Sequence, residues 1–346
     1  MHNFKRAIKT SLLFVLFIAL FSVGIMAFYF EGENYFYQTA KERASLAGEI
    51  DYLIVGASHA TRGFNPKIID EILDVDSYNA SSMSITSYGR YYMLKKEMAR
   101  NPVKTVVMEV SFETIRDDRD ENGLEGELYM LGQLDSPWER ISYWFSALKP
   151  SEYGSAYLFF RDNGLDCFKR YRKGEYKTIQ NSPYFYKGYK AYECDEPEFS
   201  GADIDYTEVY HNRKSGVSGP NDYNIEYLDK MVELCRENDI DLILITVPVS
   251  DYRIAKYTDI ENIRQWYADY ADENGIDFYD FNLLKNRSEL FDDNKDFQDN
   301  QHLYNTGADT FSKEFATLMK ERAEGKDISS YFFETYPDYE KTKGWD

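Results

Sequence analysis

The chain has 346 residues, of which 43% are hydrophobic and 17% are aromatic, so it can bury a substantial core and is not a disordered protein. Its 40 Lys and Arg residues are outnumbered by 60 Asp and Glu residues, which gives a formal net charge of -20. Because nucleic-acid binding requires clustered cations that neutralise phosphates, this charge argues against nucleic acid as a partner.

An uncharged apolar segment occupies residues 11–30, and a helix needs about 20 such residues to cross the hydrocarbon layer. Lys5, Arg6 and Lys9 precede it, and the positive-inside tendency keeps the end that carries them in the cytoplasm. The sequence therefore predicts a cytoplasmic basic segment at 1–10, a single transmembrane signal anchor in the cell membrane and an extracytoplasmic remainder. The alternative is a cleaved signal peptide, which the length of the apolar core disfavours.

After a linker at residues 31–50, short apolar runs alternate with helical patterns, which is typical of a parallel sheet covered by helices on both faces. The sequence predicts a flavodoxin-like three-layer α/β/α fold. The expected strands are residues 52–55, 77–79, 105–110, 242–247 and 276–280. The expected helices are residues 66–73, 87–99, 223–238, 260–274 and 306–323.

A long aromatic segment interrupts this alternation between residues 112 and 222. It is too long for a simple connection, so we interpret it as an insertion over the carboxyl edge of the sheet. The folded domain is expected at 51–323, and the tail at 324–346 either packs on it or extends freely. Trp138, Trp144 and the tyrosines of the segment form either a core or a surface that stacks on sugar rings, and the core is favoured.

The cysteines Cys167, Cys194 and Cys235 make neither a CxxC zinc pattern nor an even set of disulfides. A bridge between Cys167 and Cys194 and free buried thiols both remain open. His211 has no nearby cluster of ligating residues, so we predict no metal and no cofactor.

The first candidate for chemistry is Ser58, which follows the apolar strand at 52–55 in the sequence Gly-Ala-Ser-His-Ala. In an open α/β sheet, a polar residue just past the carboxyl end of a strand lies in the crevice where ligands bind. A Gly-x-Ser alone is a weak signal, since serine also caps helices and fills turns.

The second candidate is the loop before the last predicted helix, which contains Asp299 and His302. An Asp three residues before a His can fold back and hold one imidazole nitrogen, leaving the other to take a proton from a serine. The alternative is that Asp299 caps a turn and His302 is a surface residue.

Together, the strand-end Gly-x-Ser and the later Asp-x-x-His-Leu-x-x-x-Gly resemble blocks I and V of the SGNH/GDSL serine hydrolases. The resemblance implies that Ser58 is the nucleophile, His302 the general base and Asp299 its orienting acid. Within that superfamily, the motifs Gly-Ala-Ser-His-Ala, Tyr-Asn-Ala-Ser-Ser and Val-Val-Met-Glu-Val-Ser resemble a membrane-anchored branch that includes DltD-like and AlgJ-like proteins. That branch moves acyl groups on envelope polymers beside a membrane-bound O-acyltransferase.

The oxyanion donors depart from the superfamily pattern. The backbone amide of Ser58 is one candidate donor. The block II glycine is missing after the second strand, where Asn79 stands, and the block III Gly-x-Asn-Asp is missing after the third strand, where Ser111 stands. Asn79 and Ser111 are therefore the substitute candidates. His59 and Arg62 are candidates for substrate contact, and a packed histidine and a surface ion pair are the favoured alternatives.

The resemblance leads to an expected function as an extracytoplasmic serine esterase or O-acyltransferase that acts on a cell-envelope glycan or a teichoic acid-like polymer. Three alternatives stay open: hydrolysis or transfer, a lipid-directed esterase, and a non-catalytic accessory protein that binds a polymer or a membrane O-acyltransferase. The missing block III motif favours the accessory protein, and the retained Ser, Asp and His argue against it.

Overall fold

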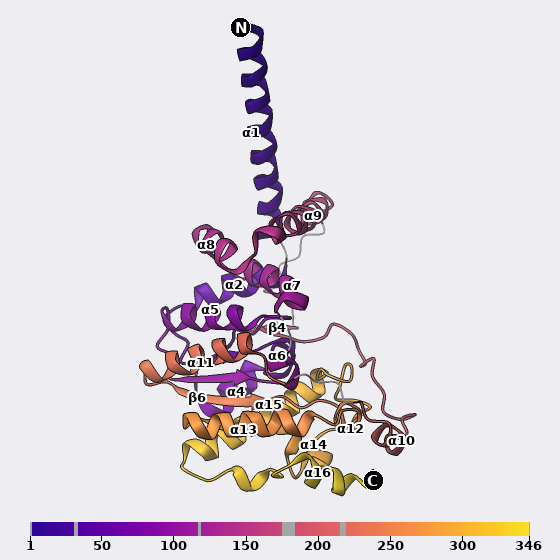
Figure 1. Cartoon of the computed structure of the whole chain (residues 1–346). Helices are drawn as coiled ribbons and strands as arrows, with labels where there is room; N and C mark the ends of the chain where they lie inside the picture. The colour runs from indigo at the N-terminus through magenta and orange to yellow at the C-terminus, as the bar shows by residue number, and fades with distance from the viewer. Residues whose placement is uncertain (1, 31–33, 117–118, 175–183, 215–218, 346) are drawn as a thin grey trace. The chain divides into compact units, whose positions relative to one another are not determined.

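A computed structural model describes residues 2–30, 34–116, 119–174, 184–214 and 219–345 (Figure 1). The chain forms two compact units. The first contains Met1–Lys41 and Met130–Ser182, and the second contains Glu42–Tyr129 and Pro183–Asp346.

The described part of the second unit is built on a five-stranded parallel sheet with the order β2-β1-β3-β6-β7. The chain runs from β1 to an outer neighbour, β2, and then returns to β3 on the other side of β1. This is the strand order of the flavodoxin-like folds, so the predicted fold class is confirmed. The strands are β1 (Tyr52–Val55), β2 (Ser77–Asn79), β3 (Thr105–Glu109), β6 (Asp241–Thr246) and β7 (Asp277–Asp280).

Helices cover both faces of the sheet, as Figure 1 shows. On one face, α15 packs against α4, and their side chains share a core with Ile54, Val107 and Ile243 of the central strands. On the other face, α11 packs against α5 and is joined to α13 by a hydrogen bond from Tyr270 to Asp229 at 2.7 Å. The bounds are α4 (Pro66–Leu73), α5 (Ser87–Met98), α11 (Asp222–Glu237), α13 (Ile260–Asn274) and α15 (Asn305–Ala323).

These bounds lie within one residue of the predicted helices because local capping residues determine them. The Asn65 side chain accepts a hydrogen bond from the amide of Lys67 at the start of α4, where Pro66 is tolerated. Gly275 ends α13 in the left-handed conformation at φ 64°. The Asn221 side chain caps α11, which therefore begins at Asp222, one residue earlier than predicted.

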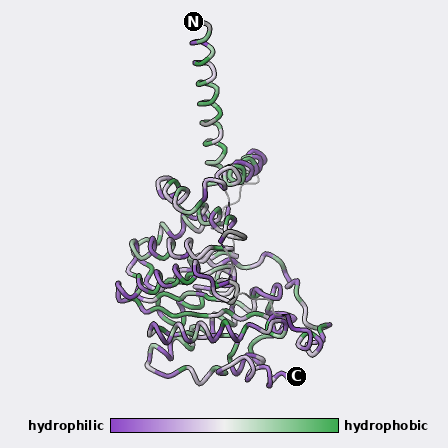
Figure 2. Tube along the Cα trace, viewed as in Figure 1, coloured by the Kyte–Doolittle hydropathy of each residue, from purple (hydrophilic) through white to green (hydrophobic). Residues whose placement is uncertain are grey.

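In the first unit, α1 (His2–Phe30) is the one helix among the described residues that is long and apolar enough to cross a membrane. Its most apolar 18-residue window, within Phe4–Phe30, has a mean hydropathy of 2.6, and Figure 2 shows the apolar residues along the helix. The predicted N-terminal apolar helix is confirmed. The same unit contains α8 (Pro137–Ala147) and α9 (Tyr153–Arg172), together with the start of α2 (Tyr35–Ser45) and the end of α7 (Arg119–Gly132).

The segment at 112–222 carries the remaining short elements, which are α6 (Phe112–Arg116), β4 (Phe185–Tyr186), β5 (Tyr189–Lys190) and α10 (Tyr206–His211). The C-terminal tail packs on the second unit, where Tyr336 and Tyr339 of α16 (Tyr336–Lys343) are each 1% exposed. All three cysteines are free thiols, and burial raises the pKa of Cys235 to about 12.

Phe311 is fully buried between Phe64, Phe281 and Phe315 on the α15 face of the sheet. Phe311→Ala should lower the free energy of unfolding by about 3–5 kcal/mol, because it removes buried area and leaves a cavity. Urea unfolding of the full chain in detergent measures the change. Tyr331→Ala is the matched control, because Tyr331 is 43% exposed and its removal leaves no cavity. Equal losses in the two variants would contradict the assignment of this core.

Candidate active site

Ser58 is the first residue of the short helix α3 (Ser58–Gly63), three residues beyond the buried end of β1. The strand order reverses between β1 and β3, so Ser58 lies at the crevice that open α/β sheets use for ligands. Gly56 is required at this turn, because a Cβ there would lie 2.6 Å from the Cβ of Glu109 on β3. The close approach of the two strand ends therefore determines where Ser58 enters its helix.

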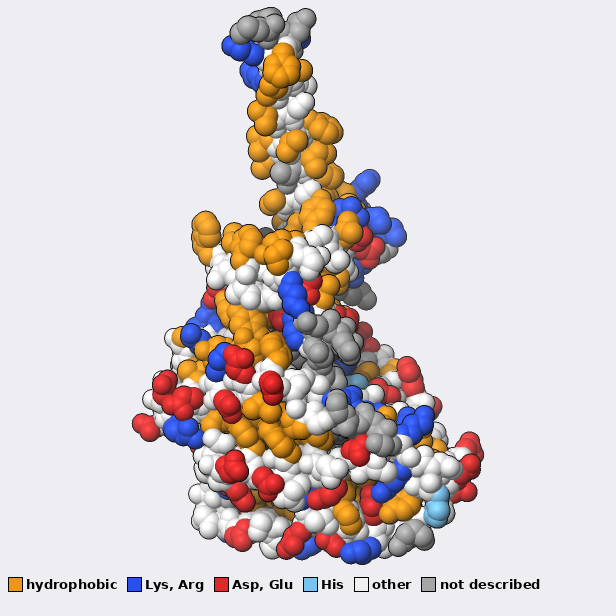
Figure 3. Space-filling model, in the orientation of Figure 1, with side chains coloured by type: hydrophobic (Ala, Val, Ile, Leu, Met, Phe, Trp, Pro, Cys, Tyr) orange, Lys and Arg blue, Asp and Glu red, His pale blue; other side chains and the backbone are white. Residues whose placement is uncertain are grey.

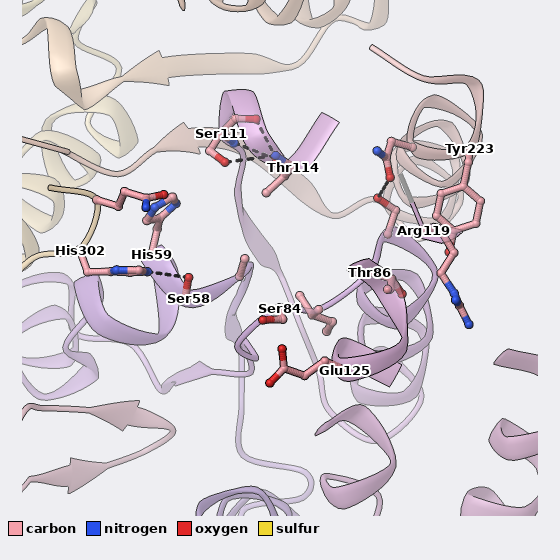
Figure 4. Close-up of a pocket in the computed structure, with 16 residues that line it drawn as sticks. Ser58, His59, Ser84, Thr86, Ser111, Thr114, Arg119, Glu125, Tyr223 and His302 are labelled. Carbon is pink, nitrogen blue, oxygen red and sulfur yellow. Dashed lines mark hydrogen bonds between the residues drawn. The ribbon is translucent and has the colours of Figure 1, made fainter. Parts of the chain in front are cut away.

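The structure brings Ser58, His302 and Asp299 together. The Nε2 of His302 lies 2.8 Å from the Oγ of Ser58, as Figure 4 shows, and the Nδ1 lies 2.8 Å from the Oδ2 of Asp299. An ionised carboxylate only accepts hydrogen bonds, so the Nδ1–H of His302 donates to Asp299. The Nε2 is then the acceptor for the hydroxyl of Ser58, which is the tautomer that a general base requires.

The Asp299 carboxylate is oriented by its own loop. Its Oδ1 accepts hydrogen bonds from the amides of Gln301 at 2.7 Å and His302 at 2.9 Å. Burial raises the pKa of Asp299, but the hydrogen bond and charge of His302 and the two amides outweigh it, so the pKa falls to about 2. Asp299 therefore stays ionised across the neutral pH range.

The two ends of this loop are joined by backbone hydrogen bonds. The amide of Gln298 donates to the carbonyl of His302 at 2.8 Å, and the buried Phe297 and Leu303 pair in an antiparallel bridge. A Cβ at Gly307 would lie 2.1 Å from the carbonyl oxygen of Asp296, so the glycine of the motif allows α15 to start against the loop. The Asp-x-x-His-Leu-x-x-x-Gly pattern thus describes a closed turn and the helix that it packs on.

A second support for the loop comes from the start of α12 (Asp251–Lys256). The hydroxyl of Ser250 donates to the carbonyl of Asn300 at 3.0 Å. Next to it, the Asp251 carboxylate accepts from Tyr339 at 2.6 Å and from Lys343 at 2.6 Å, both on α16, and pairs with the buried Arg287 at 3.2 Å. The C-terminal tail is therefore linked to the triad loop through a buried ionic cluster.

Glu109, at the carboxyl end of β3, is a residue whose role the sequence did not indicate. Its carboxylate is fully buried beneath α3, accepts from the amide of Ala57 at 2.7 Å and lies 3.5 Å from the Nδ1 of His59. Burial raises the pKa of Glu109, but the hydrogen bond of His59, the charge of Arg90 and the Ala57 amide outweigh it, and the pKa is lowered. Its signal in the sequence is an acidic residue at the end of an otherwise apolar strand.

Ser58 and His302 open into a pocket of about 380 Å³. Figure 4 shows Ser58 and His302 at one side and Arg119 and Tyr223 at the other. Most residues of the lining have hydroxyl, amide, imidazole or charged side chains, and Ile85 is its only branched aliphatic side chain among the described residues. Further polar residues of the lining are Ser84, Thr86, Ser87, Ser111, Thr114, Glu125, Asn224 and Gln301.

The two substitute oxyanion candidates are placed differently. Ser111 lines the pocket, and its hydroxyl accepts from the amide of Thr114 at 3.3 Å, which leaves the hydroxyl hydrogen to be directed elsewhere. Asn79 is 1% exposed, and its side-chain amide donates to the carbonyls of Ala60 at 2.8 Å and Phe64 at 3.0 Å. The structure therefore uses Asn79 to hold α3 and does not bring it to the described pocket lining.

The two candidates for substrate contact also differ. His59 lines the pocket, with its ring centroid 5.1 Å from that of His302. Arg62 donates to the carbonyl of Lys190 at 2.8 Å and lies 3.9 Å above the ring of Tyr192. It thus binds the segment around β5 and lies outside the pocket lining. His211 lies on the exposed α10, and among the described residues no group of three or more His, Cys, Asp and Glu is placed to hold a metal ion.

Comparisons with known proteins found similarities at low identity. A family model without a functional description matches residues 199–324, which include the triad loop, and no curated protein matches the chain. A GDSL-like lipase from Bacteroides thetaiotaomicron is 13% identical, with 84% of this chain and 98% of that chain covered at a TM-score of 0.38. A protein assigned to the G-D-S-L lipolytic family from Desulfitobacterium hafniense is 14% identical, with 78% and 98% covered at a TM-score of 0.36.

A protein assigned as an acylhydrolase from Bacteroides fragilis is 12% identical, with 82% of this chain and 94% of that chain covered at a TM-score of 0.39. The chain is therefore similar in structure to GDSL/SGNH lipase-like hydrolases at low identity. Similarity of this degree carries no weight for the activity.

The lowered pKa of Asp299 predicts a pH-dependent contribution to stability. A carboxyl whose folded pKa is depressed stabilises the fold above its unfolded value of about 3.9, and this contribution is lost as the pH falls toward about 2. The urea midpoint of Asp299→Asn should therefore lie below that of the wild type at neutral pH. The difference should shrink as the pH falls below about 4. A difference that stays constant across this range would contradict the assignment.

Arg287→Met should destabilise the fold by at most about 3–5 kcal/mol, because it removes the buried cation beside the Asp251 carboxylate and leaves Lys343 as its charged partner. The double variant Arg287→Met, Asp251→Asn should recover part of this loss. Thermal unfolding of the three proteins measures both effects. If the double variant is no more stable than Arg287→Met, the two residues do not act as a pair.

Proposed function

We propose that this protein is a serine esterase of the SGNH type that works through an acyl-Ser58 intermediate. The observation that carries the proposal is the hydrogen-bonded chain from Ser58 through His302 to Asp299, with both distances at 2.8 Å, at the mouth of a pocket. Nucleophile, base and orienting acid in contact are the arrangement that activates a serine for acyl transfer.

In the proposed reaction, the Oγ of Ser58 attacks the ester carbonyl and its proton passes to the Nε2 of His302. The tetrahedral intermediate collapses, and the leaving alcohol takes that proton as the C–O bond breaks. Ser58 is the first residue of α3, so its backbone amide has no partner within the helix and is one proposed oxyanion donor. The Ser111 hydroxyl is the second. Water, or a hydroxyl of an acceptor, then releases the acyl group by the reverse steps.

The lining of the pocket supports a substrate class. Its hydroxyl and amide groups suit a hydroxyl-rich alcohol that carries a short acyl group, and the near absence of aliphatic side chains in the described lining argues against a long-chain lipid ester. We therefore propose a cell-envelope polysaccharide or teichoic acid-like polymer as the substrate. Transfer to an acceptor and membership of the DltD/AlgJ-like branch, with a membrane-bound O-acyltransferase as partner, are part of this proposal.

The proposed location follows from α1, whose length and hydropathy suit a span of the hydrocarbon layer. With Lys5, Arg6 and Lys9 on the cytoplasmic side, the second unit lies outside the cell membrane. A signal peptide fits the same helix. It would be removed by cleavage, whereas the proposed signal anchor remains in the mature chain.

A non-catalytic accessory protein is the second candidate. The observation that favours it is the use of Asn79 as a structural group, which leaves the site with fewer side-chain oxyanion donors than the sequence had indicated. In this reading the pocket binds a polymer without hydrolysing it.

Labelling by a fluorophosphonate probe distinguishes the two candidates. The full chain in detergent should be labelled at Ser58, and peptide mass spectrometry locates the adduct. Ser58→Ala should abolish the labelling, and both Ser58→Ala and His302→Ala should lower kcat/KM for p-nitrophenyl acetate by about 10⁴-fold or more. Ser329→Ala, a substitution in an exposed turn, should leave both readouts unchanged. If the folded chain is not labelled, the esterase proposal fails and the accessory function takes its place.

A further inference from the structure

Helix α8 carries a row of exposed apolar side chains. Trp138, Ile141 and Phe145 are 79%, 49% and 67% exposed, and their spacing of three and four residues places them on one face of the helix. Large exposed apolar patches are uncommon on soluble surfaces and mark sites of interaction. The row is therefore a candidate contact surface for a partner or a membrane.

This helix lies beside the outer end of α1 in the same compact unit. The guanidinium of Arg140 lies 4.4 Å from the ring of Phe30, the last residue of α1, and Trp144 packs on Phe160 of α9 with ring centroids 6.2 Å apart. Phe160 in turn contacts Phe30 at 4.9 Å. Figure 3 shows apolar side chains gathered over α8 near the base of α1.

Helix α9 covers the outer part of α1. The hydroxyls of Tyr157 and Ser22 are 2.8 Å apart, and Phe168 packs on Phe28 at 5.0 Å. The uncharged part of α1 before this cover, residues 10–21, spans about 18 Å at about 1.5 Å per residue. A hydrocarbon core is about 30 Å thick, so a bilayer around α1 extends outward to the level where α9 crosses and α8 begins.

The charge of this unit differs from that of the rest of the chain. The part of the first unit after α1, residues 31–41 and 130–182, has 9 Lys and Arg residues and 8 Asp and Glu residues, so its net charge is +1. The second unit has 28 Lys and Arg residues and 52 Asp and Glu residues, so its net charge is -24. Three basic residues, Lys169, Arg170 and Arg172, occupy the last turn of α9. A near-neutral surface with a basic cluster approaches anionic headgroups without the repulsion that the second unit would meet.

From these observations we propose that α8 and the basic end of α9 form a lipid-binding surface. This surface lies in the membrane–water interface on the extracytoplasmic side of the cell membrane. The occupant is the anionic lipid surface itself, with Trp138, Ile141 and Phe145 buried about 5–10 Å into the boundary of headgroups and acyl chains. The proposal rests on the extracytoplasmic, anchored location proposed above. It adds a second attachment point, so that the first unit lies on the membrane and does not hang from a flexible tether.

Tryptophan quenching by lipids brominated on their acyl chains tests the surface. The full chain is reconstituted into vesicles of phosphatidylcholine and phosphatidylglycerol, with and without bromine. Wild type should lose emission in the brominated vesicles, and Trp138→Phe should lose most of the quenching that wild type shows. Trp266→Phe is the matched control, since Trp266 lies on α13 of the second unit, and its quenched fraction should equal or exceed that of the wild type.

Equal quenching of Trp138→Phe and wild type would overturn the proposal and leave a membrane-embedded protein as the occupant of the α8 face. The proposal would also be overturned if the full-length protein, once expressed, were recovered from the soluble fraction with α1 removed by cleavage. Fluorophosphonate labelling in the same vesicles separates the two proposals: quenching without labelling of Ser58 supports the lipid surface alone, and labelling without quenching supports the esterase alone.

Discussion

The contact between Gly56 and Glu109 is the constraint on which the candidate site depends. The ends of β1 and β3 approach so closely that only a glycine fits opposite the Glu109 side chain. The Glu109 carboxylate accepts a hydrogen bond from the Ala57 amide and lies beside the His59 ring, so one buried acid orients the residues on both sides of Ser58. A buried charge is costly without partners. Arg90 is the third partner of the Glu109 carboxylate, at 3.8 Å. The turn that presents Ser58 is therefore held by electrostatics as much as by packing.

The loop that carries His302 is held in a different way. The triad loop is a closed turn whose own amides orient Asp299, and it rests on Ser250 and on α15. Behind Ser250, the cluster of Asp251, Arg287 and Lys343 ties the end of the chain to the loop. Because the Ser58 turn and the His302 loop are both fixed by buried polar groups, the distance between Ser58 and His302 is set before any substrate binds, as preorganised catalysis requires.

The sequence indicated the architecture well because its signals are local or periodic. Short strands of three to six residues, the Asn65 and Pro66 start of α4 and the Gly275 stop of α13 act through neighbouring residues. The structure places the strand bounds within one residue of the prediction and the two helix ends as predicted. Ser58 and the Asp299–His302 pair were also readable, because each belongs to a short motif in which residue type and spacing express the chemistry. Their catalytic roles remain predictions that the labelling experiment tests.

By itself, the sequence determined the α/β fold, the apolar N-terminal helix and the three residues that meet at the carboxyl edge of the sheet, Ser58, Asp299 and His302. Only the tertiary structure decided the partners that come from far along the chain. It placed Glu109 under Ser58, directed the Asn79 amide to the carbonyls of α3 and not to the pocket, and joined Arg62 to the segment around β5. The physical reason is that a polar side chain bonds to whichever group lies nearest in three dimensions, and a linear pattern carries no information about that neighbour.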